Sequence, residues 1–201
     1  IIGFDHNSER EGTGIAFQGF KTAQTNGTDV ALCDSGYMTE KSSGQWFNMN
    51  NNNSTIGGWN GCNMRNNTLP VVKATLPTEL ISVIKTTTIY TDNTGGSSTS
   101  ASNVTATQDD IYLLAEFEIV GVRTYANVAE ENYQKQYSYY ASGNSKVKYK
   151  HNDTATAATW WARSVYAAHG NDFCIVYTTG TTGPVLSYYP SGLAPAFKVG
   201  G

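Results

Sequence analysis

Alternation of apolar and polar residues predicts short strands at both ends of the chain. It favours strands over 14–20 and 29–33, and a run of β-branched residues favours another over 86–91. Further strands are expected near the C-terminus, over 160–164, 172–178 and 193–199. Because Pro195 has no N–H to donate, the last of these is expected at a sheet edge or a bulge.

Apolar residues spaced three or four apart predict a few short helices. One is expected after Gly58, carrying Trp59, Cys62, Met64 and Arg65. A second begins at Pro77, which suits a first helical position, and buries Leu80, Ile81 and Ile84. The clearest helical pattern covers 129–140, which places on one face the rings of Tyr133, Tyr137 and Tyr140.

The most apolar stretch of the chain, 111–122, fits two assignments. Its β-rich start favours a buried strand, although the Leu-Leu-Ala-Glu that follows also suits the first turn of a helix. The runs 48–55 and 93–102 are too polar for either element. We expect the first to be an exposed loop and the second a flexible one.

The composition favours a loop-rich domain that still has a core. Apolar residues make up 39% of the 201 residues, and charged residues only 14%, against about 25% in an average soluble protein. The low charge excludes a charge-laced helical bundle, and the apolar share excludes bulk disorder. With helices early and antiparallel strands late, the expected fold class is α+β, in one domain over 1–201.

Charge and hydropathy narrow the possible partners. The net charge is −3 and no stretch clusters Lys and Arg, so nucleic-acid binding is not expected. No apolar run approaches the ~20 residues that span a bilayer, so membrane insertion is not expected either. The chain opens at Ile1 without a Met, and we expect it to be a piece of a longer protein.

No metal site or cofactor is expected from the sequence. The histidines His6, His151 and His169 are far apart and are expected at the surface. The cysteines form no Cys-x-x-Cys pair, so at most one disulfide is possible and its pairing stays open. Buried free thiols are the favoured interpretation for Cys33, Cys62 and Cys174.

Paired carboxylates are the one hint of catalysis. On a strand, Glu116 and Glu118 share a face about 7 Å apart, a separation between the two glycosidase geometries. Nothing else in the sequence converges on them, so a solvated face is favoured over an active site. Asp109 and Asp110 are expected to cap the turn before Ile111.

Tyrosine beside small polar residues is the sharper functional signal. Tyr supplies 13 of the aromatic residues, and several lie next to Ser, Gly or Asn in the C-terminal third. Tyr offers contact area and a polar tip at little entropic cost, which is why binding surfaces favour it. The alternative is that Tyr is simply a good strand residue. Asn-x-Ser/Thr sequons also occur, but an Asn-rich chain produces them by chance.

An ordered series of motifs resembles a known group of domains. It includes Gly58-Trp59, Met64-Arg65 and the segment 110–121 (DIYLL…EIVG), and it continues with 160–164 (WWARS), 173–176 (FCIV) and 192–197 (GLAPAF). The series resembles uncharacterised domains of gut-bacterial surface proteins and of phage tail or fibre proteins. The resemblance covers 56–201, preceded by N-terminal strands and the Asn-rich loop over 1–55.

The resemblance implies a C-type-lectin-like fold with a variable, Tyr-rich binding face. It assigns scaffold roles to Trp160, Trp161, Arg163, Pro195 and Phe197. It assigns ligand-binding positions to Tyr166, His169, Asn171, Asp172, Tyr177, Tyr188 and Tyr189. The chain departs from the pattern at Leu193-Ala194, and it lacks the calcium motifs of sugar-binding lectins.

These observations lead to an expectation of a non-enzymatic display domain. It would bind a host cell-surface protein or glycan, either from a virion surface or from a bacterial cell surface. The alternative is a structural module of a phage capsid or tail that contacts neighbouring subunits as a homo-oligomer. A glycan-cleaving enzyme that uses Glu116 or Glu118 is the third and least favoured reading.

Overall fold

The computed structural model describes residues 1–21, 29–33 and 47–200. Its helical segments are α1 (Ser8–Glu11), α2 (Gly58–Gly61), η2 (Met64–Thr68), α3 (Leu69–Ala74), α4 (Thr78–Ile81), η3 (Ala101–Asn103), α5 (Glu116–Val120), η4 (Val128–Asn132) and α6 (Ser138–Ala141). Its strands are β1 (Gly3–Phe4), β2 (Ile15–Gln18), β3 (Phe20–Lys21), β4 (Asp29–Ala31), β5 (Ile84–Lys85), β6 (Thr87–Asp92), β7 (Val104–Asp109), β8 (Lys148–Lys150), β9 (Asp153–Ala158), β10 (Trp160–Val165), β11 (Asp172–Val176), β12 (Thr182–Leu186) and β13 (Ala196–Val199).

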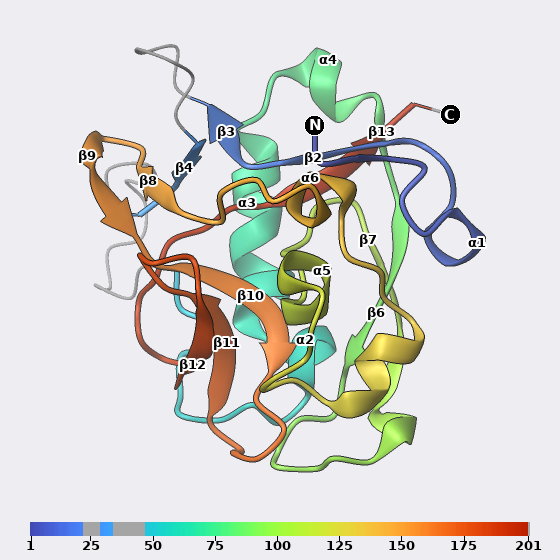
Figure 1. The fold of residues 1–201 in the computed structure, drawn as a ribbon, viewed down its shortest axis with the longest axis vertical. Helices are drawn as coiled ribbons and strands as arrows, with labels where there is room; N and C mark the ends of the chain where they lie inside the picture. Colours follow the sequence, from blue (N-terminus) through green and yellow to red (C-terminus); the bar gives the residue numbers. More distant parts are fainter. Residues whose placement is uncertain (22–28, 34–46, 201) are drawn as a thin grey trace.

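Within the described residues these strands form small, mostly antiparallel sheets. The orders are β1-β2-β13-β5, β3-β4-β8-β9, β10-β11-β12 and β6-β7. Short helices lie between and beside the sheets (Figure 1). The expected α+β class is therefore confirmed. Among the described residues, no helix has the length and apolar character needed to cross a lipid bilayer.

The first and last segments of the chain are joined in one sheet. Strand β13 pairs antiparallel with β2 over four positions, from Ala196 opposite Gln18 to Val199 opposite Ile15. Strand β1 covers the other edge of β2. Pro195 lies just before β13 and only its carbonyl is used, accepting from Gly19 N–H at 2.7 Å. Since β13 lies between β2 and β5, the expected edge position was wrong, and Pro195 avoids the ladder by preceding it.

The strands β10 and β11 form the buried centre of the fold, as their patterns predict. Every residue of both strands is buried, and Trp160 pairs with Val176 while Trp161 pairs with Ile175. The predicted helix after Gly58 is present as α2, η2 and α3, and it buries Trp59 and Met64 in the same core. These apolar faces, brought from separate parts of the chain, give the domain one continuous core.

The apolar stretch 111–122 is not a strand beyond its start. Tyr112 makes an isolated bridge with Ala196, and the chain then turns into helix α5. A local bond favours the helix, because Glu118 accepts the N–H of Ala115 at 2.9 Å, as the third residue of a capping box does. Burial of the stretch was predicted correctly. The favoured strand is wrong over Glu116–Val120, where the alternative, a helix that begins at Leu-Leu-Ala-Glu, is present.

The predicted helix over 129–140 is also wrong. The chain forms a short 3-10 helix at η4, runs irregularly, and returns to helix only at α6. Side chains in the irregular part bond to backbone elsewhere: Gln134 donates to Tyr90 O at 2.7 Å and Gln136 donates to Ile119 O at 3.1 Å. These long-range bonds outweigh a helical periodicity that three tyrosines had suggested.

Two smaller expectations need correction. The helix at Pro77 is α4, but Leu80 and Ile81 are only half-buried and Ile84 belongs to strand β5. The run 48–55 is a loop as predicted, yet it is exposed only over 51–53. Its flanking Asn48 and Thr55 are fully buried and bond to the rest of the fold. An Asn-rich run can enter a core where its amides find partners.

Candidate functional site

Loops from four separate parts of the chain meet at one end of the molecule. We call this surface the loop face and define it as residues 50–57, 93–98, 166–171 and 187–191. Thr55 N–H donates to Gly170 O at 2.8 Å, Gly57 N–H to Thr94 O at 2.8 Å, and Ser187 N–H to Asn171 O at 2.8 Å. In Figure 1 the first three of these segments gather below β11 and α2, at the bottom of the view.

Ser187 anchors the Asn-rich loop to the end of β12. Its hydroxyl donates to Asn52 O at 2.8 Å and accepts the N–H of Ser54 at 3.1 Å. Its carbonyl accepts the N–H of Asn50 at 2.9 Å. The side chain is fully buried. A single serine therefore fixes three backbone positions of a loop more than 130 residues away in sequence.

Replacing this serine tests whether the loop face is held rigid. Ser187→Ala removes a buried hydroxyl that pairs with two backbone groups, so we expect a loss of about 1–3 kcal/mol in the free energy of unfolding. The N–H of Ser54 should also exchange its hydrogen faster. Ser100→Ala, at an exposed hydroxyl whose partner is another exposed serine, should change stability by less than about 0.5 kcal/mol. Equal effects of the two variants would contradict the anchoring role.

Asp92, at the end of β6, organises the 93–98 loop. Its Oδ1 accepts the N–H groups of Thr94 and Gly95, both at 2.9 Å, and its Oδ2 accepts from Asn127 at 2.8 Å. Gly95 has φ +63, and a Cβ there would lie 1.9 Å from Thr55 O, so only glycine fits this approach. The segment expected to be a flexible loop is thus tied to the core at its start.

Tyr188 and Tyr189 are the exposed aromatic pair of the loop face. Their side chains are 37% and 46% exposed, and their rings pack edge to face with centroids 4.7 Å apart. A hydrogen bond to Tyr189 raises the pKa of the Tyr188 hydroxyl. The pair therefore presents two rings and their hydroxyls to solvent in a fixed relative geometry.

A second group of expected site residues lies on the turn between β10 and β11. The exposed His169 ring contacts Asp172, with Nδ1 3.0 Å from Oδ2, and tilts against the half-buried ring of Tyr166 at 4.8 Å between centroids. Tyr166 also packs edge to face on Tyr125. Because Asp172 pairs with Leu186 and Asn171 O accepts from Ser187, this turn adjoins the tyrosine pair.

Tyr177 does not join the other expected site residues. It follows the far end of β11, where its N–H bonds to Thr181 O in the turn to β12. It lies five positions along the chain from Asp172, about 17 Å at the usual rise per strand residue. Its half-buried ring packs over Gly183, whose Cα has room for no Cβ. We therefore assign Tyr177 to packing and remove it from the candidate site.

The residues expected to form the scaffold are buried. Trp160, Trp161 and Arg163 are fully buried on β10, and Phe197 on β13 is 6% exposed. Trp161 donates to Phe47 O at 2.6 Å. Arg163 forms a two-pronged ion pair with Glu118, in which Nη1 donates to Oε2 at 2.6 Å. Burial raises the cost of breaking such a pair, so it fixes α5 on β10.

The carboxylates considered for catalysis are both structural. Glu116 is fully buried and its Oε2 accepts the backbone N–H groups of Thr124, Tyr125 and Ala126 at 2.9–3.1 Å. Glu118 forms its ion pair with Arg163. Neither the strand geometry nor the solvated face expected for them is present, because α5 turns both side chains into the core. Each oxygen already has a protein partner.

The other side chains considered for catalysis or metal binding also take part in ion pairs or in packing. Asp109 does not cap a turn but accepts from Arg65 at 2.6 Å, while Asp110 pairs with Lys73 at 2.6 Å. Cys62 and Cys174 are buried free thiols, and the half-buried Cys33 donates from Sγ to Ala31 O at 3.2 Å. In the part of the chain that the structure describes, no three His, Cys, Asp or Glu side chains converge to hold a metal.

His6 corrects the expectation of surface histidines. It is 8% exposed and its ring stacks on Tyr137 with centroids 3.6 Å apart. Burial lowers the pKa of His6 to about 4, so the ring is neutral at physiological pH. Only His169 of the three is exposed, and His151 is half-buried.

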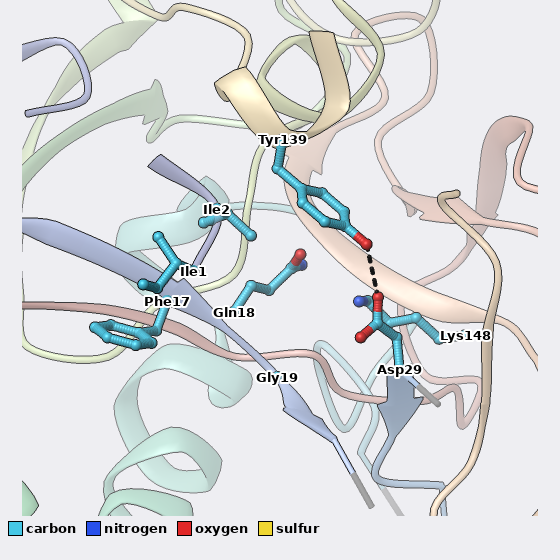
Figure 2. A pocket seen from close by; sticks show the side chains of 8 residues that line it. All are labelled: Ile1, Ile2, Phe17, Gln18, Gly19, Asp29, Tyr139 and Lys148. Atoms are coloured by element: carbon cyan, nitrogen blue, oxygen red, sulfur yellow. Dashed lines mark hydrogen bonds between the residues drawn. The ribbon is translucent and has the colours of Figure 1, made fainter. Parts of the chain in front are cut away.

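A small cleft lies away from the loop face, beside the N-terminal strands. Its volume is about 200 Å³, and it is lined by Ile1, Ile2, Phe17, Gln18, Gly19, Asp29, Tyr139 and Lys148. Figure 2 shows Tyr139 donating to Asp29 across it, at 2.9 Å. Gln18 bonds to Ala194 O and to Tyr140. Its polar side chains are mostly satisfied within the protein, which argues against a dedicated ligand site.

Sequence reasoning found the rings of the loop face but missed the residues that hold it. Ser187 and Asp92 were not among the expected site residues, whereas the Asn-rich loop was expected at the rim of the binding face. The one available signal was the position of Ser187 between a strand and two tyrosines. Its bonds join segments far apart in sequence, and no local pattern encodes such partners.

Comparison with known proteins gives one match. A family model described as a domain of unknown function (DUF6273) matches residues 28–201, which is most of the chain. No curated protein matches, and no solved structure matches. The match contains every residue of the loop face.

Proposed function

The chain belongs to the DUF6273 family of domains of unknown function, and we propose that it is a non-enzymatic binding domain displayed on a phage virion or a bacterial cell surface. Its ligand is a protein or glycan of the host surface, and the loop face is the binding surface. The observation that supports this most is the exposed Tyr188–Tyr189 pair on loops anchored by buried hydrogen bonds.

Rigid, exposed tyrosines are what a binding surface requires. Their rings lose little conformational entropy on binding, because packing already restricts them. The exposed Asn residues over 51–53 belong to the loop that Ser187, the residue before the pair, binds through Asn52 O, and they add amide donors and acceptors to this face. Such a surface has aromatic contact area at its centre and polar groups at its rim, the usual layout of a protein-binding or glycan-binding patch.

The arrangement of carboxylates argues for binding rather than catalysis. Glu116, Glu118 and Glu130 are fully buried and hydrogen-bonded within the protein. A general acid or base must reach its substrate, and these groups have no open approach in the described residues. The exposed His169 ring contacts Asp172 and packs against Tyr166, and among the described residues no hydrogen bond joins this ring to a hydroxyl or thiol.

The C-type-lectin-like fold is part of the same proposal. It is supported by the buried WWARS strand β10, by the pairing of the terminal strand β13 with β2, and by loops gathered at one end. A crystal structure of the domain, superposed on C-type-lectin-like domains, tests it. A different connection order of the paired strands would refute this part while leaving the loop face in place.

A second role, as an assembly module of a capsid or tail, has its own supporting observation. Ile1 and Phe4 are 60% and 68% exposed and line the same shallow pocket. Figure 1 shows the N-terminus at the end of the molecule away from the loop face. Apolar side chains exposed together suit contact with a neighbouring subunit. Under this reading the domain is a homo-oligomer, and Phe4→Ala weakens the oligomer rather than ligand binding.

The binding proposal predicts a large effect of the tyrosine pair. The double variant Tyr188→Ala, Tyr189→Ala should weaken adsorption to intact gut-bacterial cells or to an array glycan by about 30-fold or more, as expected for hot-spot residues. Its stability should change by less than about 0.5 kcal/mol per site, since both rings are exposed. Adsorption is measured with and without a calcium chelator.

Phe4→Ala is the matched control, because it removes an exposed aromatic ring at the other end of the molecule. It should leave adsorption unchanged. Loss of adsorption in both variants, or in neither, would overturn the assignment of the loop face. No adsorption of the folded protein to any surface would favour the assembly role.

A further inference from the structure

A buried cluster of polar side chains joins the start of the chain to its end. Lys198 lies on β13 and is 1% exposed, while Asn7 and Glu11 flank α1 and are each 6% exposed. His6, which is 8% exposed, is the fourth member of the cluster. A buried lysine, carboxylate and amide together are costly to desolvate and need a physical reason.

The contacts place one carboxylate between the lysine and the amide. Glu11 Oε2 lies 3.0 Å from Lys198 Nζ, and Glu11 Oε1 accepts from Asn7 Nδ2 at 3.1 Å. Lys198 Nζ also donates to the carbonyls of His6 at 3.0 Å and Gly12 at 3.2 Å. The carbonyl of His6 belongs to the peptide bond with Asn7, so Nζ contacts the backbone immediately before Asn7. Asn7 Nδ2 also donates to Tyr133 O at 2.8 Å.

The cluster is not a fully satisfied ion pair. The contact between Glu11 Oε2 and Nζ lacks the alignment of a hydrogen bond, and Oε2 has no other partner. The buried Nε2 of His6 also has no hydrogen-bond partner, and it lies 3.7 Å from Glu11 Oε1. A buried ion pair without hydrogen-bond alignment and a buried imidazole nitrogen without a hydrogen-bond partner are unusual in a core and need an explanation beyond stability.

We propose that Lys198 and Asn7 become joined by an intramolecular isopeptide bond, with Glu11 as the group that transfers the protons. This would be a self-modification site that locks the last strand to the first helix. It is independent of the proposed binding function, because the cluster lies in the N-terminal sheet region and not on the loop face.

The reaction is balanced without any further reactant. Lys198 Nζ passes a proton to the Glu11 carboxylate and becomes a neutral amine, which attacks Cγ of Asn7. The Nζ–Cγ bond forms, the Cγ–Nδ2 bond breaks, and Nδ2 leaves as ammonia with a proton delivered from Glu11. Nζ gives up its second proton to Glu11 in the same exchange. The products are an amide, ammonia and the regenerated carboxylic acid.

The surroundings favour the neutral forms that this chemistry uses. Burial raises the pKa of Glu11 to about 7 and lowers that of His6 to about 4. A carboxyl group that contacts both the nucleophile and the leaving nitrogen is also the geometry of a general acid–base catalyst.

Mass spectrometry of the intact, purified chain tests the proposal. The expected mass is about 17 Da below that of the sequence, because ammonia is lost. Digestion should yield a branched peptide in which the segment around Asn7 is attached to the segment around Lys198. An unmodified mass, or a branched peptide joining other residues, would overturn the proposal whether or not any variant folds.

Variants separate this reaction from other losses of ammonia. Lys198→Met, Asn7→Ser and Glu11→Gln should each restore the full mass, and circular dichroism shows whether each folds. Lys148→Met is the matched control, since Lys148 is also a buried lysine, 3% exposed and placed over the Trp160 ring at 5.1 Å. It should retain the loss of 17 Da. Retention of that loss in Lys198→Met would instead indicate a succinimide and refute the bond.

Discussion

Replacement of Arg163 by Met is expected to cost about 3–5 kcal/mol in the free energy of unfolding, the usual effect of removing one partner from a buried ion pair. The guanidinium is fully buried and donates to Glu118, Thr91 Oγ1 and Leu113 O at 2.6–2.7 Å. Met fills the space but leaves the Glu118 carboxylate charged and unpaired. Domains of this size are stable by roughly 5–15 kcal/mol, so urea denaturation should show a greatly lowered midpoint.

A matched pair at the surface provides the control. Arg123 and Glu131 form an ion pair whose side chains are 28% and 41% exposed, so Arg123→Met should cost less than about 1 kcal/mol. The double variant Arg163→Met, Glu118→Leu should recover much of the loss, because no buried charge is then unpaired. A double variant no more stable than Arg163→Met would show that the guanidinium acts through its other bonds.

The second large effect is a dependence of stability on pH that arises at Glu130. This carboxyl is fully buried, and burial raises its pKa from 4.5 to about 7. The folded state therefore binds a proton that the unfolded state has lost between these values. Its contribution to stability is fully present below pH 4.5 and is lost as the pH rises through 7. The total loss is about 3 kcal/mol, at 1.36 kcal/mol per pKa unit.

Two neighbours in the core titrate in the same pH range. Glu11, with its pKa raised to about 7, adds to the loss of stability at high pH. His6, with its pKa lowered to about 4, acts in the opposite direction, because only the unfolded chain binds its proton between pH 6.5 and 4. The expected sum is a protein most stable in mildly acidic solution and less stable above pH 7.

Glu130→Gln isolates the contribution of the single carboxyl. The stability of the variant relative to wild type should improve by about 3 kcal/mol between pH 4.5 and pH 8, whatever constant cost the lost hydrogen bonds impose. Ser164→Ala should change the pH dependence of stability in the opposite direction. It removes a hydroxyl that donates to Glu130 at 2.8 Å and lowers its pKa, so it should be more harmful at pH 8 than at pH 5. Parallel pH profiles for wild type and Glu130→Gln would refute the assignment.

The sequence predicted those elements whose signal is local. Strands β2, β4, β6, β10 and β11 were all expected within a few residues, because alternation and β-branched residues report directly on a pleated surface. The strand favoured over 111–122 was wrong and the helical alternative was right, because a continuous apolar run indicates burial but has no period that separates the two. The helix expected over 129–140 failed because bonds from Gln134 and Gln136 to distant backbone decide its path.

The residues of the candidate site also divide into those with a local sequence signal, which could be predicted, and those whose role depends on distant partners, which could not. The exposed rings of Tyr188 and Tyr189 could be proposed from their polar neighbours alone. The structural roles of Glu116 and Glu118 could not be predicted, since the partner of Glu118 is Arg163, 45 residues away in sequence. Without knowledge of such a partner, a carboxylate is expected at the solvated surface. The exclusion of Tyr177 likewise depends on strand register, which places it at the opposite end of β11 from Asp172.

The terminal sheet determines how the domain would respond to tension between its two ends. Strands β1 and β13 are both antiparallel to β2 and are therefore parallel to each other. Both ends of the chain leave from the same end of the molecule, away from the loop face (Figure 1). A pull on the start of β1 and the end of β13 acts in opposite directions along parallel strands, so the ladders are sheared and their hydrogen bonds resist together rather than being peeled one by one. The loop face lies off this mechanical path, and a ligand held there need not be released when the chain is stretched.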